Sequence, residues 1–261
     1  KKRPDLASFF LTRLKKMKEL TIYGFRPVIE AIENNQTIDK VWLVKSDKSR
    51  LFKELIIKLK NNNISYSLVP RVAFQRKYGV KNHQGVVAKI SPIEIIPIEK
   101  MIQNTESKKT TALYLLLDGI TDPRNFGAIL RSANATSVNG VIISSSSSSP
   151  INEVVVKTSS GAIFNVPISK VNNLKDAIYL LKENKVEVLG LDQAGNKTIY
   201  DSDLLNPLAL LIGSEEKGIS KGILKLINQK VKIPMTGNVE SLNVSVATSI
   251  ALFEVIRQRN L

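Results

Sequence analysis

Residues 239 to 259 read VESLNVSVATSIALFEVIRQR, and this stretch bears most directly on the fold and the function of the chain. Its first half differs from an ordinary amphipathic helix, because Ser241, Asn243 and Ser245 alternate with aliphatic residues before a run of small side chains. Small side chains let a ligand approach the backbone closely, and hydroxyl and amide groups near a helix start can hold a polar ligand. The alternative is a plain C-terminal helix that is capped by Ser241.

Two stretches upstream each combine an apolar strand with a polar loop. Residues 117 to 131 read LDGITDPRNFGAILR, and residues 210 to 220 read LLIGSEEKGIS. In each, an apolar strand runs into a glycine-containing loop that carries charged or amide side chains, and a helix follows. Ligands of open α/β sheets bind at such carboxyl ends of strands. We therefore expect the three stretches to form one composite pocket.

Three motifs occur in a fixed order in this part of the chain. They are Asn125-x-Gly127-x-x-x-Arg131, then Gly213-Ser214-Glu215-x-x-Gly218, then Ile233-Pro234-Met235 followed by SLNVSVA at residues 241 to 247. Together they resemble the signature motifs of the SpoU/TrmH family of RNA ribose 2'-O-methyltransferases, within the SPOUT superfamily. The resemblance covers about Thr111 to Arg259. One such string alone is a weak signal, whereas three in order are a strong one.

The composition limits the classes of protein and of partner. With 261 residues, 43% of them hydrophobic, the chain suffices for one large domain or two smaller ones. Its formal net charge of +15 favours a polyanionic partner, and no segment is apolar enough to span a bilayer. Cysteine is absent and His83 is the single histidine, which excludes disulfides, thiolate metal sites and histidine-rich metal sites. We expect a cytoplasmic protein that binds RNA, with no metal and no membrane partner.

The first 110 residues divide into three parts. Residues 1–19 are rich in lysine and arginine and form either a basic arm that follows RNA or a tail. Residues 20–91 have the pattern of a small α/β domain, with helices expected over 24–35, 50–60 and from 71 onward, and with strands expected over 40–45, 66–69 and 85–90. Residues 92–110 contain two prolines and a polar, unpatterned second half, which indicates a linker.

The small domain carries a resemblance of its own. The segments from Tyr23 to Ala31 and from His83 to Ala88 are similar to the RNA substrate-binding domain that precedes the catalytic domain in many members of the family. That domain has a fold like ribosomal protein L30e, so the resemblance implies that residues 20–91 bind RNA. His83 either contacts RNA or makes a hydrogen bond within a turn.

Residues 111–261 alternate between apolar runs and helical segments. The runs lie at 112–118, 138–144, 165–171, 186–192, 208–213 and 231–235, and helices are expected near 126–135, 152–163, 172–183, 221–228 and in the final stretch. Runs buried on both faces, with helices between them, indicate an α/β domain with a mainly parallel sheet. The six serines at 144–149 form a loop after the second run, either at the surface or near substrate RNA. The GxGxxG turn of a dinucleotide-binding fold is missing, and the family resemblance implies a trefoil knot instead.

The resemblance also implies a cofactor and the residues that bind it. S-adenosylmethionine is expected in the knot, with main-chain groups around Gly213, Ile233 and Leu242 recognising its adenosine end. By their chemistry alone, Ile233 and Leu242 are equally well explained as core residues. The expected cofactor-binding residues are Gly213, Ser214, Ile233, Met235, Leu242 and Val244.

The catalytic residues that the resemblance implies are Asn125, Arg131, Glu215, Ser241 and Asn243. The family arginine that matches Arg131 is assigned as the general base, yet a guanidinium is so weakly acidic that it stays charged. Arg131 therefore either takes the proton of the ribose hydroxyl or grips a phosphate and stabilises the developing alkoxide. We expect Arg131 one turn into its helix, where Glu215 could orient it as a bidentate partner, and we expect the two asparagines to hold the ribose or neighbouring loops.

The leading hypothesis is an S-adenosylmethionine-dependent RNA 2'-O-methyltransferase that acts on a guanosine of 23S ribosomal RNA. The alternatives are a tRNA ribose methyltransferase, an rRNA adenosine methyltransferase that confers antibiotic resistance, and a non-catalytic ribosome-assembly factor. The L30e-like module favours ribosomal RNA, and the intact site argues against a factor that only binds.

The last helix predicts a homodimer through the knotted domain, since its apolar surface exceeds what one domain readily buries. Family members pair in this way, although a helix that packs only on its own sheet is the alternative. The surface consists of Ala247, Ile250, Ala251, Phe253, Val255 and Ile256.

Overall fold

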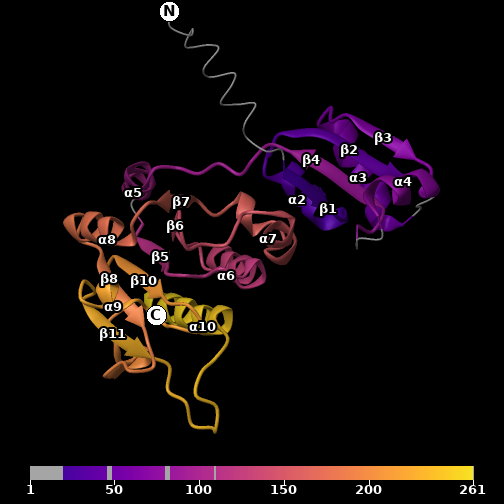
Figure 1. Ribbon diagram of the computed structural model, residues 1–261. Helices are drawn as coiled ribbons and strands as arrows, with labels where there is room; N and C mark the ends of the chain where they lie inside the picture. Colours follow the sequence, from indigo (N-terminus) through magenta and orange to yellow (C-terminus); the bar gives the residue numbers. More distant parts are fainter. Residues whose placement is uncertain (1–19, 46–48, 80–82, 109, 261) are drawn as a thin grey trace, which may run out of the picture. The chain divides into compact units, whose positions relative to one another are not determined.

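The computed structural model describes residues 20–45, 49–79, 83–108 and 110–260, so the predicted basic arm at 1–19 lies outside the described residues. The chain divides into two compact units, with the boundary between Ile93 and Glu94 (Figure 1). No helix of the described part is long and apolar enough to cross a membrane.

The first unit contains a four-stranded sheet with the order β1-β4-β2-β3. Strand β4 runs antiparallel to β1 and β2, whereas β2 and β3 are parallel. The expected helices and strands are present, and β1 is an additional strand. The strands are β1 (Leu20–Tyr23), β2 (Ile38–Val44), β3 (Tyr66–Val69) and β4 (Val86–Ile90), and the helices are α2 (Phe25–Glu33), α3 (Arg50–Asn61) and α4 (Arg71–Tyr78).

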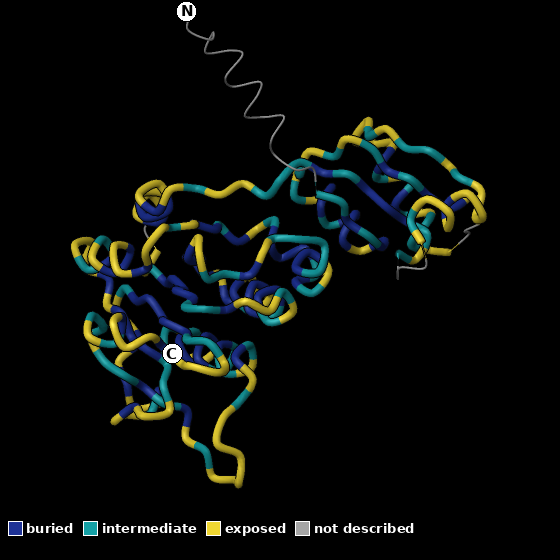
Figure 2. The backbone as a smooth tube through the Cα atoms, in the orientation of Figure 1, coloured by how far each residue is buried: buried dark blue, intermediate teal, exposed yellow. Residues whose placement is uncertain are grey.

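The second unit contains a seven-stranded sheet with the order β7-β6-β5-β10-β8-β11-β9, in which all neighbouring strands are parallel. This confirms the predicted α/β fold with a mainly parallel sheet. The neighbouring strands β6, β5 and β10 are buried along their whole length, which explains why their sequences are almost entirely apolar (Figure 2). The strands are β5 (Leu113–Leu117), β6 (Gly140–Ser144), β7 (Ile168–Val171), β8 (Glu187–Leu191), β9 (Lys197–Thr198), β10 (Leu208–Ile212) and β11 (Gln229–Lys232).

The helices of the second unit begin and end at capping residues that refine the expected bounds. Helix α6 starts three residues earlier than expected, because Asp122 caps it and Pro123 occupies its first turn. Helix α10 is capped by Asn243 and not by Ser241. The helices are α5 (Ile98–Ser107), α6 (Pro123–Ala135), α7 (Glu153–Thr158), α8 (Leu174–Glu183), α9 (Lys221–Leu224) and α10 (Val244–Arg259), with short 3-10 helices η1 (Ala162–Phe164) and η2 (Ile199–Asp201).

The segment predicted as a linker, residues 92–110, contains helix α5, which corrects that prediction. Ile98, Met101, Ile102 and Thr105 are buried and lie at the spacing of one helical face. The side chain of Met101 packs so closely on Gly140 that a Cβ atom there would collide with the sulfur. Helix α5 therefore belongs to the core of the second unit, and only the few residues before it connect the two units.

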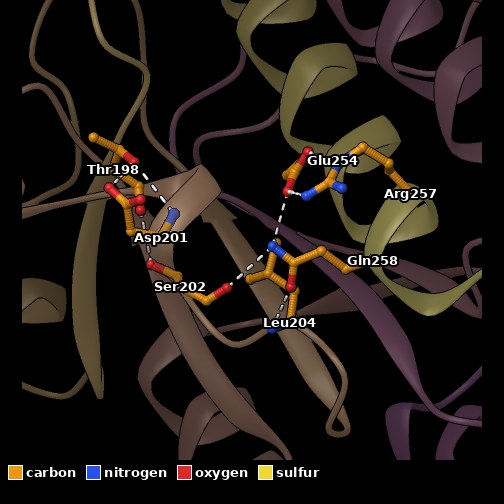
Figure 3. A network of polar contacts seen from close by, with 7 residues as sticks. All are labelled: Thr198, Asp201, Ser202, Leu204, Glu254, Arg257 and Gln258. Carbon is orange, nitrogen blue, oxygen red and sulfur yellow. Dashed lines mark hydrogen bonds and ion pairs between the residues drawn. The ribbon is translucent and has the colours of Figure 1, made fainter. Parts of the chain in front are cut away.

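The C-terminal half of α10 is fastened to the segment around η2 by side-chain hydrogen bonds (Figure 3). Gln258 accepts from the backbone N–H of Leu204 at 3.1 Å and donates to the carbonyl of Ser202 at 3.1 Å. Glu254 is 6% exposed, and its hydrogen bonds with Arg257 hold the pKa of this carboxyl below its ordinary value, against the effect of burial. These contacts fix the helix that carries the third sequence motif.

Arg259 adds a second attachment at the end of α10. Its guanidinium donates to four backbone carbonyls, and burial lowers the pKa of the group. Two of these carbonyls lie immediately before β5, and the other two lie in the segment before β10. They are the carbonyls of Thr111, Ala112, Leu204 and Asn206, at 2.6–3.1 Å.

Candidate active site

A cavity of about 430 Å³ lies at the carboxyl ends of β8 and β10, beside the start of α10. Parallel strands bring their following loops to one edge of the sheet, which explains how residues up to about 60 positions apart in sequence share one cavity. The cavity is lined by Leu191, Asp192, Gln193, Ile212, Gly213, Ser214, Glu215, Gly218, Ile233, Ser241, Leu242, Asn243, Val244 and Ala247.

The loop after β10 forms a tight turn that returns on itself. Ser214 and Gly218 exchange two backbone hydrogen bonds, of 3.1 and 2.9 Å, and Gly218 has a positive φ of 61°. A Cβ atom on Gly213 would lie 2.2 Å from the carbonyl carbon of Gly218, so only glycine fits at this position. The turn presents Glu215, Glu216 and Lys217 at its tip, where all three are exposed.

One carboxylate joins the three predicted motifs. An oxygen of Glu215 accepts hydrogen bonds from the side-chain amides of Asn125, at 2.9 Å, and of Asn243, at 3.0 Å. The amide of Asn243 also donates to the side-chain oxygen of Asn125 at 3.0 Å. We refer to Asn125, Glu215 and Asn243 as the amide–carboxylate cluster. It holds the loop after β10 against the starts of α6 and α10.

Helices α6 and α10 pack against each other and bring their N-terminal ends to the cluster. The side-chain oxygen of Asn243 accepts from the backbone N–H groups of Ser245 and Val246, so the same residue caps α10 and binds Glu215. The positive end of each helix dipole then lies near the carboxylate, which favours a negative charge there. Further along, the hydroxyls of Ser132 and Ser249 meet at 2.7 Å between the two helices.

Arg131 does not pair with Glu215, which corrects the sequence expectation. Because α6 begins at Pro123, Arg131 is six residues beyond Asn125, which is about 9 Å along the helix and roughly 240° around it. Its side chain is exposed and makes no hydrogen bond or ion pair with any other residue within the described ranges. Arg131 is therefore an available cation on the surface of α6.

Most of the expected cofactor-binding residues line the first cavity. Gly213, Ser214, Ile233, Leu242 and Val244 do so, together with Ser241, whereas Met235 is not among the lining residues. Sequence reasoning missed Asp192 and Gln193, which follow β8 and contribute the polar groups on that side. The signal was present in the sequence, because Asp192 ends an apolar run in the same way as Asp118 and Gly213 do.

A second cavity, of about 610 Å³, lies on the other side of the turn and shares Ser214, Glu215, Gly218 and Val244 with the first. Asp118, at the end of β5, accepts from the backbone N–H of Ser220 at 2.8 Å and joins the two loops of this cavity. Asn125 and Ser147 also line it. The serine-rich loop thus reaches this cavity through one residue.

Gly127 of the first motif serves helix packing. A Cβ atom there would lie 2.7 Å from the Cβ of Thr158 and 3.0 Å from the carbonyl oxygen of Val155, both in α7. The glycine allows α6 and α7 to approach each other closely, so it sets the position of the helix that carries Asn125 and Arg131.

Two family models match the chain. Residues 112–253 match the SpoU rRNA Methylase family, and residues 21–95 match a family described as RNA 2'-O ribose methyltransferase substrate binding. The chain belongs to the SpoU methylase family. It is accordingly an RNA methyltransferase, and the non-catalytic alternative is not supported.

Relatives of this SpoU family member match over nearly their whole length. A TrmH family tRNA/rRNA methyltransferase from Staphylococcus haemolyticus is 37% identical over 245 residues, which is 94% of this chain and 98% of that protein. YacO of Bacillus subtilis, which carries the same family name, is 32% identical over 92% of this chain and 96% of its own.

Solved structures share the fold. The SpoU methyltransferase AviRb from Streptomyces viridochromogenes is 24% identical, with a TM-score of 0.78 over 95% of this chain and 93% of that chain. An rRNA methyltransferase from Sinorhizobium meliloti, solved with AdoMet bound, is 22% identical, with a TM-score of 0.77 over 99% of this chain and 98% of that chain. The architecture of the SpoU family thus extends over both units of this chain.

Proposed function

We propose that this enzyme transfers the methyl group of S-adenosylmethionine to a ribose 2'-hydroxyl of RNA, at a guanosine of 23S ribosomal RNA. The observation that carries the proposal is the amide–carboxylate cluster, which joins the three family motifs between two cavities. One cavity suits a donor and the other an acceptor. This arrangement is what a transfer between two bound molecules requires.

The residues of the first cavity fit S-adenosylmethionine, which supplies an electrophilic methyl group when bound. Its volume of about 430 Å³ lies in the range of small-molecule sites. Leu191, Ile233 and Leu242 form apolar walls for an adenine ring, while Asp192 offers a carboxylate to ribose hydroxyls. Gly213 and Ser214 of the tight turn line the same cavity.

The proposed roles of the chain's own residues follow from their positions. The amide–carboxylate cluster lies where the two cavities meet, because Glu215 lines both, and Ser241 lines the first. The guanidinium of Arg131 has no hydrogen-bond or ion-pair partner among the described residues. We assign it to an RNA phosphate beside the reacting nucleotide, in preference to the role of a general base.

Ribosomal RNA is the proposed substrate because the match to rRNA enzymes includes the first unit. The rRNA methyltransferase of Sinorhizobium meliloti covers 99% of this chain, whereas a TrmH/SpoU tRNA modifying enzyme from A. aeolicus covers 62%. A tRNA substrate is the second candidate, since the relatives from Staphylococcus and Bacillus are named for both RNAs. The proposal places the enzyme in the cytoplasm as a homodimer.

Mapping 2'-O-methyl groups tests the proposal. RNA from cells with and without the protein is compared, and the purified enzyme is then incubated with S-adenosylmethionine and with unmodified 23S rRNA or tRNA. We expect one guanosine of 23S rRNA to lose its methyl group in the deletion strain and to regain it in vitro. A site in tRNA, or a methyl group on a base, would overturn the respective part of the proposal.

A further inference from the structure

One face of the sheet in the first unit gathers aromatic and lysine side chains. Cross-strand neighbours project from the same face, and the register aligns Tyr23 with Val87, Val87 with Trp42, and Lys40 with Lys89. Phe74 and Tyr78 of α4 pack on the same face, in a cluster with Val44 and Val87. We call the partly exposed part of it, around Trp42, Lys40 and Lys77, the Trp42 face.

Two lysines lie over the indole of Trp42. The Nζ atom of Lys77 is 4.6 Å from the ring centroid of Trp42, and that of Lys40 is 5.9 Å away. Tyr78 lies beside them, with its ring centroid 5.9 Å from that of Trp42. Both lysine distances are within the range of cation–π attraction. The indole thus lies beneath two positive charges, and it is only partly buried.

Neither lysine has a carboxylate partner among the described residues. Lys40 and Lys77 occur in no ion pair of that part of the chain, whereas Lys58 of α3 binds Glu33 at 2.6 Å. The opposite face of the sheet differs, since Val41 and Leu43 are fully buried there and α2 and α3 pack against each other. The two ammonium groups can bind an anion, and the partly exposed indole can stack on an aromatic ring. The Trp42 face therefore suits a ligand that is both anionic and aromatic.

We propose that an unpaired base of the RNA stacks on Trp42, with Lys40 and Lys77 binding the adjoining phosphates. Stacking on an indole accepts any base, and lysines above and beside the ring suit the phosphates on either side of that base. The proposal deepens the function given above, because it assumes that the substrate is RNA. On this proposal the first unit binds an unpaired nucleotide, so it prefers the loops and ends of RNA to an uninterrupted duplex.

The chain itself provides the probe, because Trp42 is its single tryptophan. The full-length protein is titrated, without S-adenosylmethionine, with a single-stranded oligoadenylate of about ten nucleotides and with a duplex of the same length. Fluorescence of Trp42 is expected to be quenched by the single strand and to change little with the duplex, whose bases are already stacked. Binding of the single strand without any change in Trp42 fluorescence would overturn the proposal.

Variants separate stacking from general electrostatics. Trp42→Ala is expected to weaken single-strand binding by roughly 5- to 100-fold, measured by fluorescence anisotropy of a labelled strand, whereas Trp42→Phe retains most of the affinity. Lys77→Ala is expected to weaken it several-fold. The matched control is Lys53→Ala, which removes an equal charge from an exposed position on α3. Circular dichroism verifies folding, and Trp42→Phe remains informative if Trp42→Ala does not fold.

The outcomes distinguish this inference from the proposed function. If RNA quenched the fluorescence of Trp42 but the protein transferred no methyl group, the inference about the Trp42 face would stand and the proposed 2'-O-methyl transfer would be refuted. Methyl transfer with unchanged RNA affinity in Trp42→Ala would refute the Trp42 face alone. Equal weakening by Lys77→Ala and Lys53→Ala would also refute it, since only net charge would then matter, and so would tighter binding of an acidic peptide than of the single strand.

Discussion

Glu215 links the loop after β10 to the starts of α6 and α10, since one of its oxygens accepts hydrogen bonds from both Asn125 and Asn243. We predict that Glu215→Ala lowers the affinity for S-adenosylmethionine by about five- to tenfold, because the loss of these bonds to an exposed carboxylate costs about 1 kcal/mol. Glu215→Gln keeps an acceptor oxygen and should restore most of that affinity. Isothermal titration calorimetry measures both.

The neighbouring Glu216 provides the control for Glu215. It lies on the same exposed turn and carries the same charge, yet it has no hydrogen bond to another residue in the described ranges. Glu216→Ala should therefore bind the donor like the unmodified enzyme. If both alanine variants bound S-adenosylmethionine equally weakly, the loss of a negative charge would explain the effect, and the hydrogen bonds of the cluster would not.

Arg131 supports a different prediction, because it lies outside the cluster and outside both cavities. Arg131→Ala should lower the single-turnover rate of methyl transfer by at least about 100-fold, as expected when a contact that positions the substrate RNA is lost. Donor binding should stay unchanged, and Arg131→Lys should recover only part of the rate. Rapid transfer by Arg131→Ala, or its failure to bind S-adenosylmethionine, would refute the assignment.

At this scale the sequence predicted the composition of the cluster but not its pairing. Asn125, Glu215 and Asn243 were expected together because each follows or begins an element at the same edge of the sheet. The expected pair of Arg131 and Glu215 depended on where α6 begins. Because Asp122 caps α6, Asn125 lies inside the helix, and Arg131, six residues further on, points roughly 240° around the helix axis away from it.

Helix α10 exposes an apolar stripe that one subunit does not cover. Val246 is 46% exposed and Phe253 is 54% exposed, at positions seven residues apart. Ala251 and Val255 were predicted on this surface, but both are fully buried and do not belong to the stripe. A spacing of seven residues is two turns, so the exposed side chains lie on one side of the helix. The proposed homodimer would cover this stripe.

Phe253→Asp tests the dimer. We predict that it converts the protein to a monomer and abolishes activity, because each carboxylate would meet its symmetry mate at a twofold contact. Tyr179→Asp is the control, since Tyr179 on α8 is also 54% exposed and lies on another helix of the same unit. Sedimentation equilibrium at sub-micromolar concentration decides the question, and an active monomeric form of the unmodified protein would contradict the prediction.

Helix α5 shows why short elements between domains are hard to predict. Pro97 precedes its first residue and polar residues fill its last turn, so the sequence has the composition of a linker. The helix forms because Ile98, Met101 and Ile102 contact the core of the second unit. That partner is remote in sequence, and the pattern of the segment alone does not contain it.

For the whole molecule, the two units predict a separation of RNA binding from donor binding. A fragment of residues 94–261 should bind S-adenosylmethionine like the full chain and should bind RNA more weakly. A fragment that starts at Ala112 lacks α5 and should unfold at a lower temperature, because the pocket around Gly140 loses Met101. Calorimetry and thermal unfolding followed by circular dichroism measure these effects. Full RNA affinity in residues 94–261 would contradict the prediction.

The affinity of the full chain for RNA should also fall steeply with salt, as the formal charge of +15 implies. Each phosphate contact contributes a slope of about 0.7 to 0.9 in a plot of log affinity against log salt. Filter binding over a series of potassium chloride concentrations measures the slope. A slope near zero would mean that the basic surface does not contact the RNA backbone.

At this scale the parallel sheet was predictable, whereas the path of the chain was not. Apolar strands alternating with helices indicated β5, β6, β8 and β10 from the sequence, because strands that are buried on both faces consist mostly of apolar residues, with Ser144 and Glu187 as the polar residues at their ends. The trefoil knot remains a prediction from resemblance, since threading is a property of the whole path that no local pattern records. Strand β9 has two residues and gives no pattern at all.

Arg259 has a consequence for how the protein is made. Its guanidinium satisfies the carbonyls of Thr111 and Ala112, 148 and 147 residues earlier in the chain. A ribosome releases the polypeptide from its N-terminal end, so the first unit can fold while the second is still being synthesised. The second unit cannot close until α10 has emerged. Until then the partly made chain exposes the surfaces that α10 covers, and exposed apolar surface of this kind is what chaperones protect during synthesis.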